Sequence, residues 1–573
     1  MASETIVSAT SRRRSELKTL EAAVTVLQGN AESFAKLPIA SKRALIRQTM
    51  DRILDVAERW VADGSRAKGI PIDGGEEWLT GPVPTMRNLR LLDETLCRIE
   101  QGHTTIADKQ IRERRDGRLE VSVFPTCGLD ATLFAGFRIA QVMEPGMELQ
   151  AVKENAGAFY RDKAQTGSVT LILGAGNVSS IAPTDALHKS FAEGSVCIIK
   201  MNPVNEWVGP HLEYAFKPFI DKGYMRIVYG ADDVGAYLVN HASIDAIHIT
   251  GSNHTHDMIV WGPPGKERDQ RMRDNTPLLN KRISSELGNV SPVAIVPAEY
   301  SRGELAFMAK NVAAMITNNA SFNCNAAKVL ITATRWAQRE HFMGKMEQAL
   351  QDTPTRLAYY PGAFDRYERL VGDRANVKKL GRTANTVLPW TILYDVDPAR
   401  KDDPLFRTEP FCPIISEARL DANEPAAFVQ QAADFMNDTL RGTLNATFMI
   451  QGRLERTGEV AQALDRAIMD LRYGTVTINH WAALGFAAMS PVWGGHPSST
   501  LDDAQSGIGW VHNTNLLEGV EKSVLRGPLT LFPKPAWFAD NNKTAAIGAK
   551  LLALEHSPGW LKLPGMAFTA LQG

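Results

Sequence analysis

Apolar and polar positions follow two regular patterns along most of this chain. Apolar residues recur at every third or fourth position across residues 41–61, which predicts an amphipathic helix within a largely helical stretch of residues 1–100. Alternation then marks residues 119–123, and Asp116-Gly117 stands just before them, a dipeptide typical of a tight turn between antiparallel strands. The N-terminal part is therefore expected to form helices followed by a hairpin.

From Ser168 onward, short apolar runs alternate with helical patterns. Strands are expected at 169–173, 196–199, 225–228 and 245–249, with a helix between each pair. Because this order brings strands into parallel pairs, we expect a doubly wound sheet, whose ligands bind at the carboxyl ends of the strands. The residues expected at those ends are Asn177, Lys200, Gly230, Gly251 and Ser252.

A second α/β series begins near Pro292, with a strand at 293–296, a helix at 304–316 and another strand at 329–331. The chain has 573 residues, 44% of them apolar, which is enough for several domains with large cores. Its 63 basic and 64 acidic residues nearly balance, and this argues against nucleic-acid binding driven by charge.

The five cysteines are far apart, odd in number and without the spacing of a zinc site, so no metal is expected. Such usage fits free thiols in a reducing compartment. The polar start, residues 1–14, lacks the apolar core of a signal peptide, and no apolar run approaches the roughly 18 residues of a membrane span. These features predict a cytoplasmic protein with no membrane span.

Cys324 lies in a polar, asparagine-rich segment between the helix at 304–316 and the strand at 329–331. A cysteine there is a poor core residue and a good nucleophile, because nearby amides can favour its thiolate. A buried, inert cysteine is the alternative when this residue is taken alone. Glu286 follows another strand, close to Gly288, where a carboxylate could activate a water, although most glutamates are simply solvated.

Gly174-Ala175-Gly176 after a strand suggests a dinucleotide fingerprint, but Ser179 replaces the third glycine and Lys200 replaces the expected acidic residue. Asn177 offers another use of this turn, since its side-chain amide could donate to an oxyanion. Thr250-Gly251-Ser252 before a helix could bring backbone amides near a phosphate. Each segment is equally compatible with an ordinary tight turn.

Taken in order, these residues resemble the aldehyde dehydrogenase superfamily over roughly residues 165–500. Glu286-Leu287-Gly288, Glu409-Pro410-Phe411-Cys412-Pro413 and two later motifs, at 474–479 and 491–495, extend the resemblance. It implies that Cys324 is the nucleophile, Glu286 the water activator and Asn177 the oxyanion donor. The cofactor-binding residues that it implies are Lys200, Gly230, Gly251, Ser252, Leu287, Glu409 and Phe411.

The resemblance also implies an α/β fold with a Rossmann-type cofactor domain, an α/β catalytic domain and a small β oligomerisation element. Residues 1–110 and 166–285 would form the cofactor-binding domain, and residues 286–480 the catalytic domain. Residues 111–165 and 481–573 would form the oligomerisation hairpin and a C-terminal extension in a homodimer or homotetramer. The aromatic residues of that extension are expected to pack on the body or on a neighbouring subunit.

The implied activity is NAD(P)-dependent oxidation of an aldehyde to a carboxylic acid through a cysteine thiohemiacetal and thioester. Pro203 stands where many NAD-preferring members carry glutamate, so NADP is expected to be tolerated beside NAD. Two alternatives stay open: an acylating enzyme in which coenzyme A replaces water, and a binding protein that kept the fold without activity. The departures from the family pattern that keep them open are Ala175, Gly176, Asn289 and Cys412.

Overall fold

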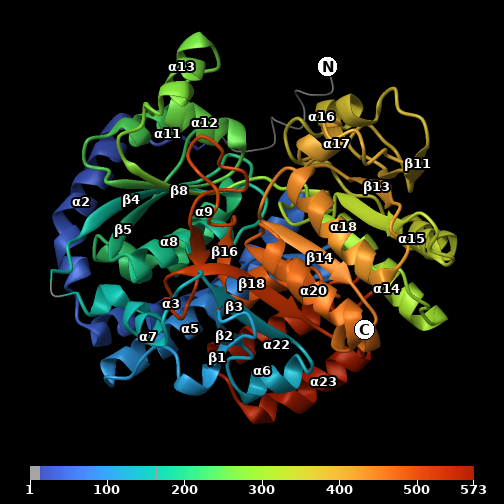
Figure 1. Cartoon of the computed structure of the whole chain (residues 1–573). Helices are drawn as coiled ribbons and strands as arrows, with labels where there is room; N and C mark the ends of the chain where they lie inside the picture. Colours follow the sequence, from blue (N-terminus) through green and yellow to red (C-terminus); the bar gives the residue numbers. More distant parts are fainter. Residues whose placement is uncertain (1–12, 163) are drawn as a thin grey trace.

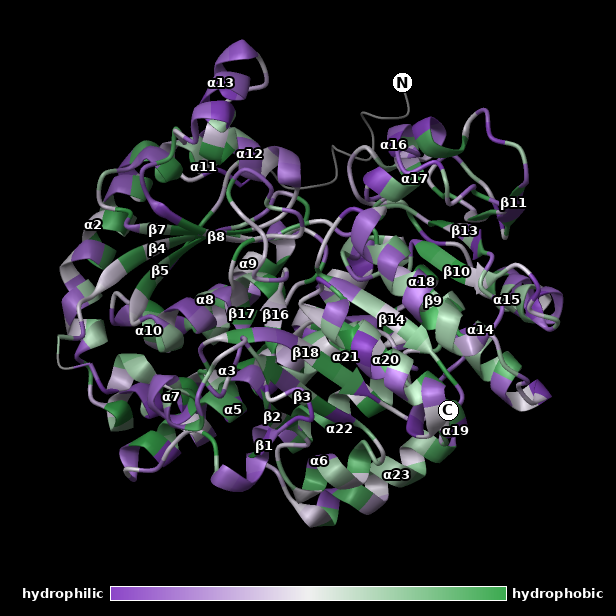
Figure 2. Cartoon of the chain, viewed as in Figure 1, coloured by the Kyte–Doolittle hydropathy of each residue, from purple (hydrophilic) through white to green (hydrophobic). Residues whose placement is uncertain are grey.

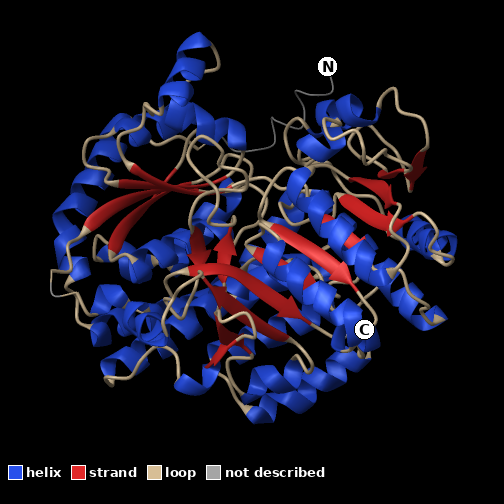
Figure 3. Cartoon of the chain, in the orientation of Figure 1, coloured by secondary structure: helices blue, strands red, loops and turns tan. Residues whose placement is uncertain are grey.

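The computed structural model describes residues 13–162 and 164–573 (Figure 1). Nearly all of the polar start, residues 1–12, and Lys163 lie outside the described residues. Two sheets organise the molecule, one of five strands and one of eleven, and helices pack around both (Figure 3). The expected α/β fold is confirmed.

The five-stranded sheet has the order β6-β5-β4-β7-β8, and every neighbouring pair is parallel. All side chains of β5 are buried, as expected for an inner strand covered on both faces. Helices α2 (Leu17–Ala35) and α8 (Ile181–Ala192) both pack on β4 and β5. The strands are β4 (Ser168–Leu173), β5 (Ser195–Lys200), β6 (Met225–Val228), β7 (Ala246–Thr250) and β8 (Arg282–Glu286).

The N-terminal region is helical, as its periodicity predicts. The long helix α3 (Ile39–Lys68) packs against α5 (Pro82–Glu100). Pro38 precedes α3, and Gly69 ends it in the left-handed conformation, with φ of 62°. The last residue of α3, Lys68, is thereby directed toward the interior, where it is 3% exposed.

The eleven-stranded sheet has the order β1-β2-β3-β18-β15-β14-β9-β10-β13-β12-β11. Its strands from β18 to β12 pair in parallel, whereas β1, β2, β3 and β11 join by antiparallel pairing. The parallel strands are β9 (Pro292–Ile295), β10 (Val329–Ala333), β12 (Trp390–Leu393), β13 (Ile414–Leu420), β14 (Asn445–Met449), β15 (Thr475–Ile478) and β18 (Val520–Arg526). The antiparallel strands are β1 (Ile111–Glu113), β2 (Leu119–Phe124), β3 (Arg138–Met143) and β11 (Val377–Leu380).

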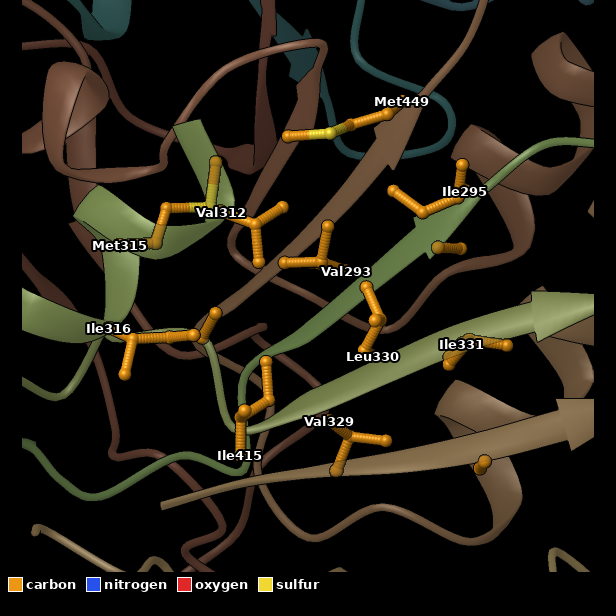
Figure 4. Packing of buried hydrophobic residues seen from close by; sticks show 14 of the residues in the cluster. Val293, Ile295, Val312, Met315, Ile316, Val329, Leu330, Ile331, Ile415 and Met449 are labelled. Carbon is orange, nitrogen blue, oxygen red and sulfur yellow. The ribbon is translucent and has the colours of Figure 1, made fainter. Parts of the chain in front are cut away.

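Helix α14 (Arg302–Thr317) anchors the main core to this sheet. Ser301 and Glu304 form a capping box at its start. Figure 4 shows its Val312 and Ile316 close to Val293 of β9 and Leu330 of β10, all of them fully or nearly fully buried. Helix α14 therefore holds the segment that follows it, which contains Cys324, over the edge of the sheet.

The predicted hairpin is present, with Gly117 at φ of 81° in its turn. Strand β3 follows the hairpin and pairs with β18, and β18 pairs in parallel with β15. The β1–β3 segment therefore completes the large sheet within a single chain, so all eleven strands come from one polypeptide.

The C-terminal segment after β18 crosses back over the body and ends in α22 (Thr544–His556) and α23 (Leu563–Leu571), next to α5 (Figure 1). Trp537 and Phe538 pack on the body, with the Phe538 ring centroid 5.1 Å from that of Phe307. By contrast, Phe532, Trp560 and Leu561 are largely exposed in this chain.

A buried ion-pair network fastens this segment. Glu555 of α22 accepts hydrogen bonds from Arg87 and Arg90 of α5, each at 2.7 Å. Arg87 also pairs with Asp130 at 2.7 Å. The Arg87 guanidinium holds the pKa of Asp130 at about 2, against the opposing effect of burial, which is the largest single contribution. Four charges thus lie under the C-terminal helix, and each has an opposite partner.

The charged segment at 262–269 is a loop only in its first half. From Lys266 the chain forms helix α13 (Lys266–Asp274), which projects from the body and has no buried residue (Figure 2). Glu267 and Arg271, four residues apart, form an ion pair that favours the helix. Within the described residues, no helix is long and apolar enough to cross a bilayer.

Glu555→Ala is expected to lower the free energy of unfolding by about 3–5 kcal/mol, because two buried arginines would lose their shared carboxylate. Denaturant unfolding measures the change. The matched control is Glu267→Ala, which removes a surface ion pair and is expected to cost at most about 1 kcal/mol. Equal effects of the two substitutions would contradict the structural role assigned to Glu555.

Candidate active site

Cys324 follows a short 3-10 turn, η5 (Asn318–Ser321), and precedes β10. Its side chain is half-buried and faces a cavity of about 440 Å³. The backbone before it is strained, because Asn319, Ala320 and Ser321 have φ of 52°, 52° and 69° in the left-handed region that non-glycine residues rarely adopt. Such a run persists only where surrounding contacts hold it.

Two buried side chains hold this loop. Lys328 Nζ donates to the Ser321 carbonyl oxygen at 3.0 Å and to Ser321 Oγ at 2.9 Å. Asn319 Nδ2 donates to Asn323 Oδ1 at 3.0 Å and to the Asn177 carbonyl oxygen at 3.0 Å. Burial lowers the pKa of Lys328 to about 8. The loop is therefore shaped by polar groups that are themselves out of solvent.

Glu286 ends β8, and its side chain is buried near the loop that contains Cys324. The Cys324 thiol and the Trp493 indole both lie beside its carboxyl group and favour its ionised form. Burial raises the pKa of Glu286 to about 8, and the carboxylates of Asp185 and Glu409 add to the rise. Among the described residues, Glu286 Oε1 has no hydrogen-bond partner.

Burial also raises the pKa of the Cys324 thiol, and the charge of Glu286 reinforces the shift. Both groups therefore hold their protons at neutral pH in the absence of ligand. Because the thiol lies beside the carboxyl group, a proton can pass from Cys324 to Glu286 once that carboxyl is ionised.

Asn177 follows β4 and lines the same cavity as Cys324. Its Nδ2 donates to the Phe322 carbonyl oxygen at 3.0 Å, which places the amide beside the nucleophile loop. Its own carbonyl oxygen accepts from Lys68 Nζ at 2.7 Å, and Lys68 pairs with Glu77 at 2.7 Å. An ion pair from the N-terminal helices thus fixes the position of Asn177.

Three residues that depart from the expected family pattern, Gly176, Asn289 and Cys412, are accommodated by their local surroundings. A Cβ atom on Gly176 would lie 2.7 Å from Asn202 Oδ1, so no side chain fits there. Asn289 Nδ2 donates to Ser291 Oγ at 2.9 Å and to the Asn445 carbonyl oxygen at 3.1 Å, which ties the start of β9 to β14. Cys412 is fully buried, and burial raises the pKa of its thiol to about 11.

Four further candidates stand at the carboxyl ends of the five-stranded sheet. Lys200 ends β5, and burial lowers the pKa of its ammonium group. Gly230 has φ of 144°, and a Cβ there would lie 2.4 Å from a methyl of Val234. Gly251 N–H donates to the Glu286 carbonyl oxygen at 3.0 Å, and Ser252 Oγ accepts from Thr255 N–H at 3.1 Å. Ser252 therefore caps α12 (Asn253–Trp261).

These positions fit a nicotinamide dinucleotide. A Cβ on Gly251 would meet only Ile249, at 3.5 Å, so the start of α12 has open space in front of it. The first amides of a helix suit a pyrophosphate, and Lys200 supplies a cation at the same end of the sheet, where β4 separates its strand from β7. The parallel strand order places both at the end of the sheet where such ligands bind.

Three more of the expected cofactor-binding residues lie near Cys324 or Glu286: Glu409, Phe411 and Leu287. Glu409 Oε1 accepts from Asn289 N–H at 3.2 Å, and burial raises the pKa of Glu409 to about 7. The Phe411 ring centroid lies 5.8 Å from that of Phe322, which precedes Cys324 in the loop. Leu287 is buried, and its N–H already donates to the Ser506 carbonyl oxygen at 2.9 Å.

Sequence reasoning overlooked the two buried lysines, Lys68 and Lys328. Lys328 stands directly before the apolar run of β10, and a lysine at the start of a buried strand was a usable signal of a buried polar contact. Lys68 ends an amphipathic helix, where lysine is common, so the sequence held no signal for its contact with Asn177.

The sequence of residues 138–516 matches the family model described as the aldehyde dehydrogenase family. Among solved structures, aldehyde dehydrogenase KauB from Pseudomonas aeruginosa aligns at 18% identity with a TM-score of 0.61, covering 90% of each chain. The NADP complex of glyceraldehyde-3-phosphate dehydrogenase GapN from Methanocaldococcus jannaschii aligns at 14% identity with a TM-score of 0.59, covering 90% of this chain and 95% of that one.

A third similar structure is a cysteine-to-alanine mutant of aldehyde dehydrogenase C from Pseudomonas syringae, in complex with NAD+ and octanal. It aligns at 14% identity with a TM-score of 0.59 and covers 91% of each chain. At these identities the structural matches establish the shared fold.

Lys328→Met is expected to lower the free energy of unfolding by about 1–3 kcal/mol, because the buried Ser321 carbonyl oxygen would lose its donor. The aldehyde-oxidation rate is expected to fall with it, since the strained loop carries Cys324. Lys345→Met, on the exposed face of α15 (Arg339–Asp352), is the matched control and is expected to change neither quantity. A Lys328→Met protein with unchanged stability would contradict this account of the loop.

Proposed function

The chain belongs to the aldehyde dehydrogenase family, and we propose that it oxidises an aldehyde to the corresponding carboxylic acid with NAD or NADP as hydride acceptor. One observation carries the proposal: the Cys324 thiol lies beside the buried Glu286 carboxyl group at a cavity that Cys324 and Asn177 both line. The NADP and NAD+ complexes among the similar structures support a nicotinamide cofactor.

The first step is addition of the thiol to the aldehyde. Glu286, once ionised, accepts the thiol proton while Cys324 Sγ bonds to the carbonyl carbon and the carbonyl π electrons move to oxygen. The Asn177 amide has two N–H groups, of which the Phe322 carbonyl oxygen uses one. The other, together with the Cys324 N–H, would donate to the oxyanion of the thiohemiacetal.

The cofactor would extend from the residues at the carboxyl ends of the five-stranded sheet to the residues near Cys324. Lys200, Gly251 and Ser252 would hold its adenosine and pyrophosphate end, and Glu409 and Phe411 its nicotinamide end. Bound NAD or NADP supplies the hydride acceptor that turns the thiohemiacetal into a thioester. Pro203 stands in place of the usual glutamate three positions after Lys200, and we therefore propose that NADP is accepted beside NAD. The carboxylates that act on Lys200 are instead those of Asp232, Asp233 and Glu206.

The last step releases the acid. Glu286 first releases to solvent the proton that it took from Cys324. It then takes a proton from water as the water oxygen bonds to the acyl carbon, the carbon–sulfur bond breaks, and Glu286 gives this proton to the departing Cys324 thiolate. The Oε1 atom of Glu286, which makes no hydrogen bond within the described residues, is the natural acceptor for that proton.

Glu286→Gln is expected to reduce kcat by about 10²–10⁴-fold, the usual contribution of a general base. NAD(P)H absorbance measures this. Hydroxylamine attacks thioesters without such a base but converts aldehydes to oximes, so it is tested with an activated ester such as p-nitrophenyl acetate as the acyl donor. It should restore part of the ester turnover of Glu286→Gln and none of that of Cys324→Ala, measured by nitrophenolate absorbance. Turnover restored specifically by coenzyme A would instead identify a thiol as the natural acyl acceptor, and wild-type turnover in Cys324→Ala would overturn the mechanism.

The rate is also expected to depend on pH through Glu286. A carboxyl group whose pKa is raised to about 8 is protonated below that pH and cannot accept a proton, so kcat should rise as pH increases through about 8. In Glu286→Gln this rise should be lost. A wild-type kcat that is already maximal at pH 6 would show that Glu286 is not the base.

A further inference from the structure

The cavity in front of Cys324 is far larger than the reacting groups require. Its volume of about 440 Å³ lies within the range of about 300–1,000 Å³ typical of pockets that enclose whole small molecules. One wall comes from the β2–β3 region, where Phe124, Phe134 and Phe137 line it. Trp481 and Phe486 line it close to Cys324.

The opposite wall comes from the C-terminal segment. Trp537, Ile547, Leu551 and Met566 line the cavity, and all four belong to the part of the chain after β18. Phe532 lines the cavity as well but is 87% exposed, which marks the opening to solvent on this side. The C-terminal segment is therefore a wall of the site as well as a covering of the body.

Polar contacts of the C-terminal segment with the rest of the chain hold this wall in place. Glu555, on the same helix as Leu551, binds Arg87 and Arg90. Trp537 Nε1 donates to Asn311 Oδ1 at 3.2 Å, which ties the segment to α14. The two contacts hold the wall from both ends, so its shape can select among substrates.

Charged groups at the cavity are already paired. Its lining includes three charged side chains from the described residues, Arg87, Lys534 and Glu555. Arg87 and Glu555 neutralise each other, and Lys534 pairs with Asp540. A phosphate or carboxylate on the substrate would lose its hydration on entering the cavity and would find no unpaired cation among these side chains. Burying such an unpaired charge costs free energy.

We propose that the substrate is an uncharged aldehyde with a large hydrocarbon part, and that the C-terminal wall sets how large that part can be. This inference rests on the proposed aldehyde oxidation. The carbonyl group would lie at Cys324 and Asn177, and the hydrocarbon between the phenylalanines of the β2–β3 region and Leu551 of α22. Straight-chain and terpenoid aldehydes share this chemistry, and activity assays distinguish them.

The test measures kcat/KM for linear alkanals from two to fourteen carbons, for a cyclic terpenoid aldehyde, and for succinic semialdehyde and glyceraldehyde 3-phosphate. We expect kcat/KM to rise about fourfold per methylene, the factor for burying one CH₂ group, until the cavity is filled. The two charged aldehydes should be the poorest substrates. A higher value for the terpenoid than for any alkanal would assign the cavity to a branched or cyclic hydrocarbon.

Leu551→Trp tests the wall itself. The larger side chain would shorten the cavity, so kcat/KM should fall at least tenfold for the longest accepted substrates while short alkanals keep their wild-type values. Leu571→Trp, on the exposed face of α23 and outside the cavity lining, is the matched control and should leave the profile unchanged. A Leu551→Trp effect that is equal for all chain lengths would overturn the role of the wall.

A second readout does not depend on turnover. In Cys324→Ala, a long-chain alcohol such as dodecanol should raise the Tm, whereas succinate should not. Oxidation of short, long and charged aldehydes at similar kcat/KM would overturn the substrate inference and leave the proposed function intact. Absence of NAD(P)H formation with every aldehyde would instead overturn the proposed function.

Discussion

The contact between Cys324 and Glu286 joins the two larger sheets of this protein. Glu286 is the last residue of β8, at one edge of the five-stranded sheet, and Cys324 precedes β10 in the eleven-stranded sheet. Between β8 and β9 the chain crosses from one sheet to the other through Gly288 and Asn289, and Glu409 packs against both of these residues. The candidate site therefore depends on how closely the two sheets approach at this crossing.

Bringing the two sheets together here costs free energy, and contacts from the surrounding residues offset that cost. A buried carboxyl group loses hydration, and each left-handed non-glycine residue before Cys324 costs on the order of 1–3 kcal/mol. Lys328 donates to the Ser321 carbonyl oxygen and Asn319 to the Phe322 carbonyl oxygen, and Lys68 holds Asn177 beside this loop. The raised pKa of Glu286 follows from the same burial, so the features that strain the site also set its proton chemistry.

Much of this arrangement could be predicted from the sequence. Strand–helix alternation identified the parallel sheet and the positions of Lys200, Gly230 and Gly251 at its strand ends, because such patterns are local. The burial of Glu286 and the contact of Lys68 with Asn177 could not be predicted, since they come from segments far apart in the chain. Lys328 lies only seven residues after Ser321, and its charge directly before β10 did carry a signal. The pairing of β3 with β18 is equally long-range. The C-terminal segment was expected to pack on the body or on a neighbouring subunit, because its aromatic residues carry no pattern that says which of them face a cavity.

The most direct test of the central claim is to locate the acyl group during turnover. The protein, mixed with aldehyde and NAD+ or NADP, would be quenched in acid, digested and mapped by mass spectrometry. The account predicts an acyl mass on the peptide containing Cys324 and unmodified peptides for the other four cysteines, which serve as internal controls. Acylation of another cysteine, or steady product formation with no acylated Cys324 at any time point, would contradict it.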